Sequence, residues 1–306
     1  MIRLDDLGLF VRTAALGSFS NAAREADLLP GQASAAVARL EAELGVRLFA
    51  RSTRSLRLTP EGQSYLPYAR EVLAALREGR ERLVEDSGAL QGSLRIAAPS
   101  DLGRNVLLPW LSDFRRQHPH LDLHLHFSDQ VADVFRDPVD VAIRLGAVSD
   151  ASFVALPLVP GNRRVLVASP SYLKRRGAPA SLEDLPNHDC LSWMMKGNAY
   201  DKWSFPVDDG CQVVQVSPVL VCDDADVVRR LAIEGHGIAY KSWLDVRADI
   251  ASGRLAQVLA GQLGELAPLH FICPHRQQFS PAIRRLHAAL RERFDEIVAV
   301  DGPGHY

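Results

Sequence analysis

The chain has 306 residues, of which 47% are apolar, and a formal net charge of -2. This length and composition predict two or three domains with cores of their own. The small net charge excludes a chain that is basic throughout, so any affinity for nucleic acid must be local. No segment resembles a signal peptide and no apolar run could span a bilayer. We therefore expect a cytoplasmic protein with no membrane partner.

The four cysteines are widely spaced, with no C-x-x-C pair: Cys190, Cys211, Cys222 and Cys273. This spacing argues against a zinc site and against a disulfide framework. Apolar, strand-like surroundings favour inert thiols at Cys222 and Cys273, while a redox switch stays an open alternative. Two histidines, His124 and His126, are close in sequence, but nothing else completes a ligand set. We expect no metal and no cofactor.

Two short helices are predicted near the N-terminus. Apolar residues recur at helical spacing over residues 5–16, and Gly17 ends this helix. Ser18 is a suitable N-cap for a second helix, which runs to about residue 26. The tight turn that follows leads into a third helix, as in a helix-turn-helix unit.

The third predicted helix covers residues 30–44 and ends at Gly45. Its first turn holds Pro30, where the missing N–H costs nothing. An apolar stripe should pack on the first two helices; it consists of Ala33, Val37, Leu40 and Leu44. The opposite side carries Gly31 and Ala35, flanked by Gln32, Ser34 and Arg39. This side is either a groove-reading face or the small-residue surface of an ordinary helical bundle.

The next segment favours the first alternative. Between Glu43 and Glu61 there is no acidic residue, and the segment holds four arginines: Arg47, Arg51, Arg54 and Arg57. Leu56 and Leu58 alternate with Arg57, as in a strand with one solvated face. A basic hairpin beside a helix-turn-helix is the expected electrostatic footprint for phosphate contacts.

These motifs together resemble the winged helix-turn-helix of LysR-type transcriptional regulators. The matching residues are Gly17-Ser18-Phe19, Ala22-Ala23, Ser34, Leu40-Glu41, Leu44-Gly45, Leu48-Phe49, Arg51, Leu58-Thr59 and Gly62. The resemblance implies an interface with double-stranded DNA. The residues expected at this interface are Ser18, Ser20, Pro30, Gly31, Gln32, Ser34, Ala35, Arg39, Arg51, Arg54 and Arg57.

Two departures from the family pattern bear on DNA reading. Leu29 stands where the family usually has a Ser or Thr cap, and the loss of such a cap costs about 1 kcal/mol. Ser34 is followed by two alanines where the family often carries Arg-Gln. We therefore expect modest direct readout by Gln32, Ser34 and Arg39, with Ala35 touching thymine methyl groups. DNA shape and the wing would contribute the rest.

A long helix is predicted over residues 59–88, since Thr59-Pro60-Glu61 combines a cap, a first-turn proline and an acid. Its apolar residues follow a 3-4 spacing typical of a coiled-coil seam: Leu66, Ala69, Leu73, Leu76 and Leu83. Pro67 should kink the helix near its start. The helix either packs on its own domain or, as the resemblance implies, pairs two subunits. A dimer or tetramer would then bind a near-palindromic operator.

Strand-like and helical text alternates through the rest of the chain, which predicts α/β sheets. Strands are expected at SLRIAA, LDLHLHF, VDVAIRLG, RVLVAS, PVLVC, GIAY and LHFIC, with helices over residues 102–118 and near Leu182, Ala225 and Pro281. The resemblance implies a periplasmic-binding-protein-like effector domain over residues 91–300. Its two subdomains would be residues 91–160 with 266–300, and residues 161–265, with a small effector between them.

The expected effector residues are Ser100, Asp101, Leu102, Arg144, Trp193, Asp223 and Tyr240. Ser100 could cap the next helix, whose free N–H groups favour an anion such as a carboxylate. Asp223 and Asp224 would repel an anion and suit capping better. Arg144 could pair with a carboxylate or form an internal salt bridge. The aromatic-rich text around Trp193 either lines a pocket or belongs to a subdomain core.

No G-x-S-x-G elbow, HExxH or P-loop is present, so we do not expect an enzyme. The sequence predicts an N-terminal all-α winged helix-turn-helix, a long linker helix and a two-subdomain α/β effector domain. The predicted function is transcription regulation by a homo-oligomer whose operator binding responds to a small, anionic effector. The alternative is a cytoplasmic small-molecule-binding protein without transcriptional control.

Overall fold

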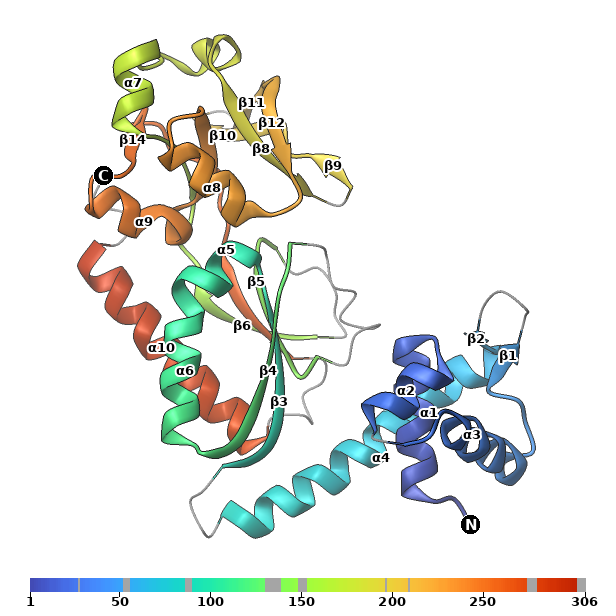
Figure 1. Cartoon of the computed structure of the whole chain (residues 1–306). Coiled ribbons are helices and arrows are strands. Elements are labelled where there is room, and N and C mark those ends of the chain that lie inside the picture. The colour runs from blue at the N-terminus through green and yellow to red at the C-terminus, as the bar shows by residue number, and fades with distance from the viewer. Residues whose placement is uncertain are drawn as a thin grey trace. The chain divides into compact units, whose positions relative to one another are not determined.

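The protein divides into two compact units in the computed structural model (Figure 1). The N-terminal unit is formed mainly by Met1–Leu90, and the C-terminal unit by most of the chain after Gln91. The structure describes residues 1–26, 28–51, 56–85, 90–129, 139–147, 153–195, 197–208, 210–273 and 280–301. Each unit is described by itself.

The N-terminal unit contains four helices and a two-stranded hairpin among its described residues. The elements are α1 (Leu4–Leu16), α2 (Phe19–Glu25), α3 (Pro30–Leu44), β1 (Phe49–Arg51), β2 (Leu56–Leu58) and α4 (Pro60–Glu85). Gly17 and Gly45 end α1 and α3 with φ of 60° and 70°, a left-handed conformation that glycine adopts without strain. The Ser18 hydroxyl accepts a hydrogen bond from the Asn21 amide at 3.3 Å and caps α2. The predicted order of elements is confirmed.

The core of this unit joins the helices to the hairpin. The predicted stripe of α3 is buried at Ala33, Val37 and Leu40. Val37 and Leu40 pack in one cluster with Phe10 of α1 and Phe49 of β1. The rings of Phe10 and Phe49 meet edge to face, with centroids 5.7 Å apart. The hairpin is therefore part of the core and not an appended loop.

The first half of α4 also belongs to this core. Ala69 is buried there, and Leu66 and Leu73 pack against the same cluster. Three residues of the predicted subunit seam thus have partners within their own domain, so the intramolecular alternative holds for this half of the helix. Two other apolar residues of α4, Val72 and Leu76, are exposed.

The C-terminal unit contains two sheets. The first has the strand order β4-β3-β5-β15-β6. Its strands are β3 (Gln91–Ala98), β4 (His120–Phe127), β5 (Val141–Leu145), β6 (Val154–Val159) and β15 (Leu269–Cys273). β3 is parallel to β4 and β5, whereas β15 is antiparallel to β5 and β6. The last strand therefore returns to the first sheet after the chain has built the second.

One helical segment connects β3 to β4. It comprises α5 (Ser100–Leu102), a π-helical turn η1 (Gly103–Leu107) and α6 (Leu108–Gln117), where the sequence predicted one helix over residues 102–118. α6 packs beside α10 (Pro281–Asp301), and the rings of Trp110 and Phe294 meet with centroids 4.9 Å apart. Figure 1 shows these two helices side by side against the first sheet.

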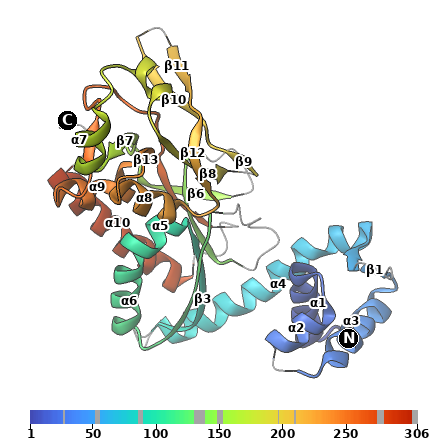
Figure 2. The same ribbon diagram turned by 45° about the horizontal axis from the view of Figure 1, so that its top comes forward.

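The second sheet has the order β12-β8-β13-β7-β14, with β9 paired to β8. Its strands are β7 (Arg164–Ala168), β8 (Cys190–Met195), β9 (Asn198–Ala199), β12 (Pro218–Cys222), β13 (Ile238–Ser242) and β14 (Ala256–Val258). The helices around it are α7 (Pro170–Arg176), the 3-10 helix η2 (Leu182–Asn187), α8 (Ala225–Ile233) and α9 (Trp243–Ala251). A hairpin of β10 (Lys202–Val207) and β11 (Gly210–Gln215) completes this part, and Figure 2 shows it beside the sheet.

The predicted fold class is confirmed, with additional elements. The sequence pattern did not predict β6, β8 to β11, β14, α7 or α9. Their apolar residues follow neither the helical spacing nor the strict alternation of a strand with one buried face. Within the described part of the chain, no helix is long and apolar enough to cross a membrane.

Candidate nucleic-acid interface and effector region

The outer face of α3 is exposed as the sequence predicted. Gly31, Gln32, Ala35 and Arg39 are exposed on it, and Ser34 is half-buried. Ser20 in α2 and Arg57 in β2 are also exposed, whereas the side chain of Ser18 caps α2. Arg54 and the side chains of Pro30 and Arg51 lie outside the described residues.

Gln32 has a structural contact that the sequence analysis missed. Its side-chain Oε1 accepts a hydrogen bond from the Leu29 amide at 2.7 Å. A leucine side chain cannot accept the reciprocal bond, so only one half of a capping box is present. The Gln32 side chain thus supplies the N3 half of the box, and the acceptor that a Ser or Thr at position 29 would offer to the first-turn amides is absent. The signal was available, because a Gln three residues after an N-cap position is typical of this motif.

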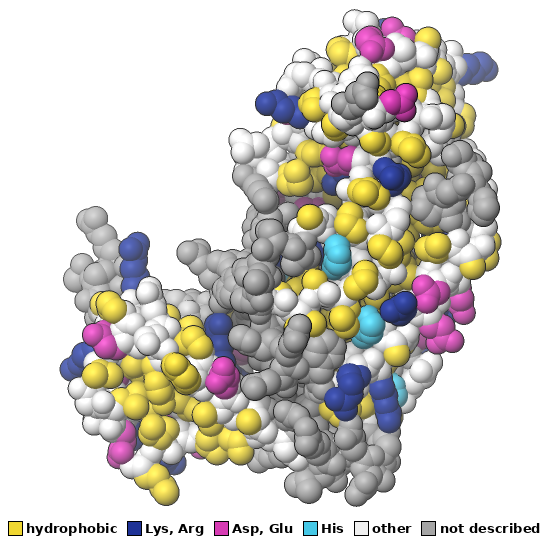
Figure 3. All heavy atoms as spheres, turned by 180° about the vertical axis from the view of Figure 1, so that it is seen from behind, with side chains coloured by type: hydrophobic (Ala, Val, Ile, Leu, Met, Phe, Trp, Pro, Cys, Tyr) yellow, Lys and Arg dark blue, Asp and Glu magenta, His cyan; other side chains and the backbone are white. Residues whose placement is uncertain are grey.

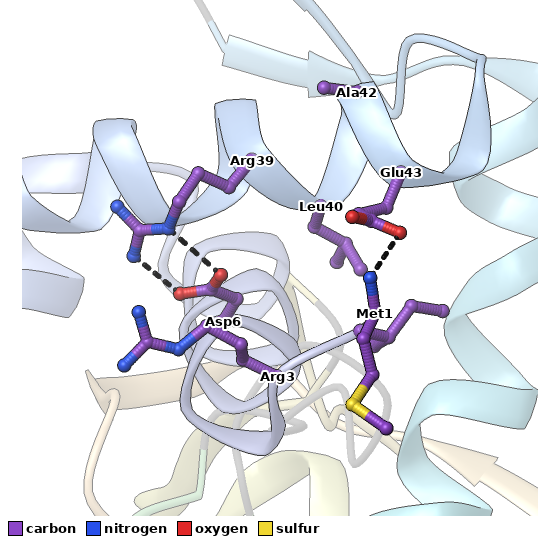
Figure 4. Close-up of a pocket in the computed structure, with 8 residues that line it drawn as sticks. Met1, Arg3, Asp6, Arg39, Leu40, Ala42 and Glu43 are labelled. Carbon is purple, nitrogen blue, oxygen red and sulfur yellow. Dashed lines mark hydrogen bonds and ion pairs between the residues drawn. The ribbon is translucent and has the colours of Figure 1, made fainter.

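Arg39 is engaged with α1. Its guanidinium donates two hydrogen bonds to the Asp6 carboxylate, from Nε at 3.0 Å and from a terminal nitrogen at 2.6 Å (Figure 4). Asp6 is buried, and the hydrogen bond to it raises the pKa of Arg39. This two-pronged geometry fixes the guanidinium plane, so Arg39 sets the position of α3 against α1.

The wing is held by a buried glutamate of α3. Glu41 accepts hydrogen bonds from the amides of Leu48 and Phe49 at 2.8 and 3.1 Å and from the Arg47 guanidinium at 2.9 Å. Burial acts to raise the pKa of Glu41, but these three donors prevail and lower it. The glutamate of the matched Leu40-Glu41 motif therefore fixes the entry to the wing.

The exit from the wing is held at Thr59. Its hydroxyl accepts a hydrogen bond from the Gly62 amide at 3.0 Å and donates one to the Arg47 carbonyl at 2.6 Å. The Thr59 amide donates to the Leu48 carbonyl at 2.9 Å. The predicted cap of α4 is confirmed, and it also joins both ends of the hairpin.

In the C-terminal unit, the expected effector residues at the start of α5 are buried. Ser100, Asp101 and Leu102 are each at most 1% exposed. The prediction that Ser100 caps the helix is wrong, because Ser100 is the first helical residue and Pro99 is the N-cap. The hydroxyl of Ser100 instead contacts Asp129 and Asp224.

Asp224 caps α8, as the sequence predicted. Its Oδ1 accepts hydrogen bonds from the amides of Asp226 and Val227 at 2.9 and 3.3 Å. Its other oxygen accepts from Arg104 at 2.7 Å. Its neighbour Asp223 is exposed. Figures 1 and 2 both show α8 next to α5, where these contacts lie.

A buried ammonium group joins α5 to the second sheet. Lys241 in β13 lies 2.6 Å from Asp101 and 3.6 Å from Asp245, and donates to the Ala225 carbonyl at 2.9 Å. Both carboxylates act against burial to raise the pKa of Lys241, which keeps it charged. A single cation thus compensates two buried acids.

Beside this group, Arg229 of α8 pairs with Asp249 of α9 at 2.6 Å. It also lies 3.3 Å from Asp226 and 3.9 Å from Asp101. The Asn105 amide donates to Asp226 at 2.8 Å and to Asp101 at 2.9 Å. Charged and amide groups therefore link the helical segment after β3 with α8 and α9.

We predict that the stability of the C-terminal unit falls between pH 4 and pH 7. Burial raises the pKa of Asp245 to about 7, so the folded state keeps a proton that the unfolded chain releases above its ordinary pKa. This stability is present at low pH and is lost as pH rises through 7, with a slope of up to about 1.4 kcal/mol per pH unit. The four tryptophans all lie after Gln91, so their fluorescence during urea unfolding follows this unit. Asp245→Asn should flatten the profile; an unchanged profile would contradict the assignment.

The remaining expected effector residues have different surroundings. Trp193 is buried, and two cations lie near its ring: the Arg164 guanidinium is 4.9 Å and the Lys241 ammonium 5.3 Å from the ring centroid. Tyr240 is fully buried, and its hydroxyl donates to the Ser204 carbonyl at 2.6 Å and accepts from the Glu265 amide at 2.7 Å. Tyr240 therefore belongs to the core of the second subdomain.

Arg144 lies in β5 opposite His270 of β15, and burial lowers its pKa. Sequence reasoning missed Asp129, Lys241 and Arg229. Asp129 had a readable signal, because it stands two residues after a predicted strand, as Ser100 does. Among the described residues, no group of His, Cys, Asp and Glu is placed to hold a metal ion.

An exposed helix face beside an anchored hairpin, followed by a two-sheet α/β unit, is the architecture of a DNA-binding protein with a second, α/β domain. Residues 4–63 match the family described as "Bacterial regulatory helix-turn-helix protein, lysR family", and residues 87–295 match "LysR substrate binding domain". The chain therefore belongs to the LysR family of DNA-binding transcriptional regulators. It is a regulator and not an enzyme, and members of its family bind DNA and small-molecule effectors and form oligomers.

Known relatives cover most of the chain. The regulator DmlR of Escherichia coli (strain K12) is 32% identical over 256 residues, which are 84% of this chain and 83% of that protein. CrgA of Neisseria meningitidis serogroup C (strain 8013) is 33% identical over 261 residues, with 85% and 86% covered. The solved structure of CrgA from Neisseria meningitidis covers 95% of this chain and 98% of its own, with a TM-score of 0.61 at 29% identity.

Proposed function

We propose that α3 enters the major groove of a near-palindromic operator and that the wing contacts the flanking phosphates. The observation that carries this proposal is the exposed outer face of α3 beside a hairpin whose two ends are anchored by Glu41 and Thr59. The proposed DNA contacts are Ser20, Pro30, Gly31, Gln32, Ser34, Ala35, Arg51, Arg54 and Arg57. Ser18 and Arg39 hold α2 and α3 in position for those contacts.

We also propose that residues 59–88 pair two subunits in a dimer or tetramer. Support comes from α4, which leaves Tyr68, Val72 and Leu76 exposed. Figure 3 shows hydrophobic side chains gathered on one face of the N-terminal unit. Exposed apolar residues of this kind are typical of association surfaces. A paired α4 would place two copies of α3 on the two half-sites.

The proposed effector is a small anion bound between two α/β subdomains, residues 91–160 with 266–300 and residues 161–265. Its proposed contacts are Ser100, Leu102, Arg144 and Trp193, with Tyr240 behind them in the core. Asp101 and Asp223 would border the site without contacting the anion, because their carboxylates would repel it. The effector would act by a population shift, so it must bind two arrangements of the protein with different affinity. The links from α5 to α8 and β13 are the groups that such a shift would rearrange.

DNA binding across a salt series tests the DNA contacts. The full chain is titrated on DNA from its own upstream region and on a shuffled sequence. Arg57→Ala should weaken binding to both and reduce the salt slope by about 1, because it removes a phosphate contact. Gln32→Ala should reduce the preference for the operator by about tenfold.

Lys174→Ala is the matched control, because it removes an exposed positive charge from α7 in the C-terminal unit. It should leave both affinity and preference unchanged. If Gln32→Ala keeps the full preference for the operator over the shuffled sequence, the proposal that the Gln32 side chain reads bases is wrong. If the protein binds none of the genomic fragments saturably, all of the proposed DNA contacts are wrong.

A further inference from the structure

Asp129 reaches the start of α5 because of the sheet topology. β3 and β4 are parallel neighbours, with Ala98 opposite Phe127. The Ser128 amide donates to the Ala98 carbonyl at 3.0 Å and extends this pairing beyond the strands. The carboxyl ends of parallel neighbours lie at one edge of a sheet, so Asp129 is brought beside Ser100.

The Asp129 carboxylate is bound there by three donors. Its Oδ1 accepts a hydrogen bond from the Ser100 amide at 3.1 Å. Its Oδ2 accepts from the Ala225 amide at 2.6 Å and from the Ser100 hydroxyl. Ser100 is 1% exposed and Ala225 is 6% exposed, so these donors are buried.

The two amides belong to helical segments of different subdomains. Ser100 begins the segment that follows β3 of the first sheet, and Ala225 begins α8, which follows β12 of the second sheet. Amides at such positions have no partner within their own helix. One carboxylate therefore supplies the missing acceptor to both helices and joins the two subdomains.

We propose that the Ser100 amide, the Ser100 hydroxyl and the Ala225 amide form a carboxylate site that is filled by the protein's own Asp129. A carboxylate from solution reaches these donors only by displacing Asp129. This inference deepens the proposed function and rests on it: an anionic effector that binds here exchanges with an internal ligand. Its ligand class is small carboxylates.

The tether gives Asp129 an advantage over a free acid. An attached ligand acts at a high effective concentration, because its translational freedom is already lost. Asp224 Oδ1 also lies 3.1 Å from the Ser100 hydroxyl, but Asp224 does not take the place of Asp129 at the two amides, because its oxygens already accept bonds from Arg104 and from the first turn of α8. Removal of the Asp129 carboxylate thus leaves the two buried amides without an acceptor, and a free carboxylate that binds them can also accept from the Ser100 hydroxyl.

The test is acetate binding to the full-length Asp129→Ala variant, measured by calorimetry, together with its thermal unfolding followed by tryptophan fluorescence. The variant should bind acetate saturably and at least about tenfold more tightly than the wild type, whose tethered carboxylate competes. Its melting temperature should be lower by about 5 °C, because three donors lose a charged acceptor. Acetate should restore this loss, and equal sodium chloride should not.

Asp122→Ala is the matched control, since Asp122 is an exposed carboxylate of β4. It should neither lower the melting temperature nor create acetate binding. Equal acetate affinity in the wild type and Asp129→Ala would overturn the proposal, as would a folded Asp129→Ala that binds no acetate.

If Asp129→Ala does not fold, Asp129→Asn keeps the side-chain volume but leaves one acceptor oxygen. This variant should lose stability without gaining acetate binding, and wild-type stability would overturn the proposal. The acetate measurements need no DNA. A failure of operator binding would therefore count against the proposed function and leave this inference standing.

Discussion

Replacement of Lys241 by methionine is expected to lower the free energy of unfolding of the C-terminal unit by about 3–5 kcal/mol. Lys241 is 1% exposed and lies between the carboxylates of Asp101 and Asp245. Methionine fills similar space but removes the cation closest to Asp101 and the ammonium beside Asp245, and leaves Asp101 with Arg229 at 3.9 Å. Such uncompensated buried charge is among the costliest effects of a single substitution. Urea unfolding followed by tryptophan fluorescence measures the loss.

The double variant Lys241→Met/Asp101→Asn separates charge from packing. Neutralising Asp101 removes part of the uncompensated charge, so the double variant should regain stability over Lys241→Met alone. If Lys241→Met is as stable as the wild type, Lys241 does not hold the network together. Equal stability of the single and double variants would place the cost in packing.

The second large effect is expected at Gly62, where α4 meets the wing. A Cβ atom at Gly62 would lie 2.1 Å from the Leu48 carbonyl oxygen, and this oxygen is the acceptor of the Thr59 amide. Backbone atoms must shift to relieve such a contact. Gly62→Ala should destabilise the N-terminal unit by about 2–3 kcal/mol and weaken operator binding at least about tenfold, because the wing is displaced.

Gly79→Ala provides the matched control within the same helix. Gly79 is exposed, and a Cβ there meets nothing within 4 Å. Alanine is the better helix former, so this variant should gain about 0.5–1 kcal/mol. Far-UV circular dichroism measures both variants, and the DNA titration measures the wing. Wild-type operator affinity of Gly62→Ala would contradict the role of this close approach.

The importance of Gly62 could be predicted from the sequence, whereas that of Lys241 could not. Gly62 belongs to a motif that the sequence displays, since it follows Leu58-Thr59 at the family's spacing. Lys241 stands in strand-like text with no local sign of its partners. The contact at Gly62 joins residues around one hairpin, whereas that of Lys241 joins β13 to a helix more than a hundred residues earlier.

The same division runs through the candidate DNA interface. The face of α3 was readable, because burial of Val37 and Leu40 leaves Gly31, Gln32 and Ala35 outward. Of the structural roles of Gln32 and Arg39, only that of Gln32 could be predicted from the sequence. Gln32 accepts a hydrogen bond from the amide of Leu29, three residues earlier, and such a short-range contact can be predicted from the sequence. Arg39 binds Asp6, 33 residues away, which required the packing of α1 on α3.

By itself, the sequence determined the class of protein, the ends of the helices in the N-terminal unit and most strands of the first sheet. These features depend on local physics: left-handed glycines, hydroxyl caps and apolar periods act within a few residues. Only the tertiary structure decided which carboxylate occupies the donors of Ser100 and Ala225. Ser100 lies 29 residues from Asp129 and 124 from Asp224. Such partners are chosen by the crossing of the chain between two sheets, and no local pattern encodes that crossing.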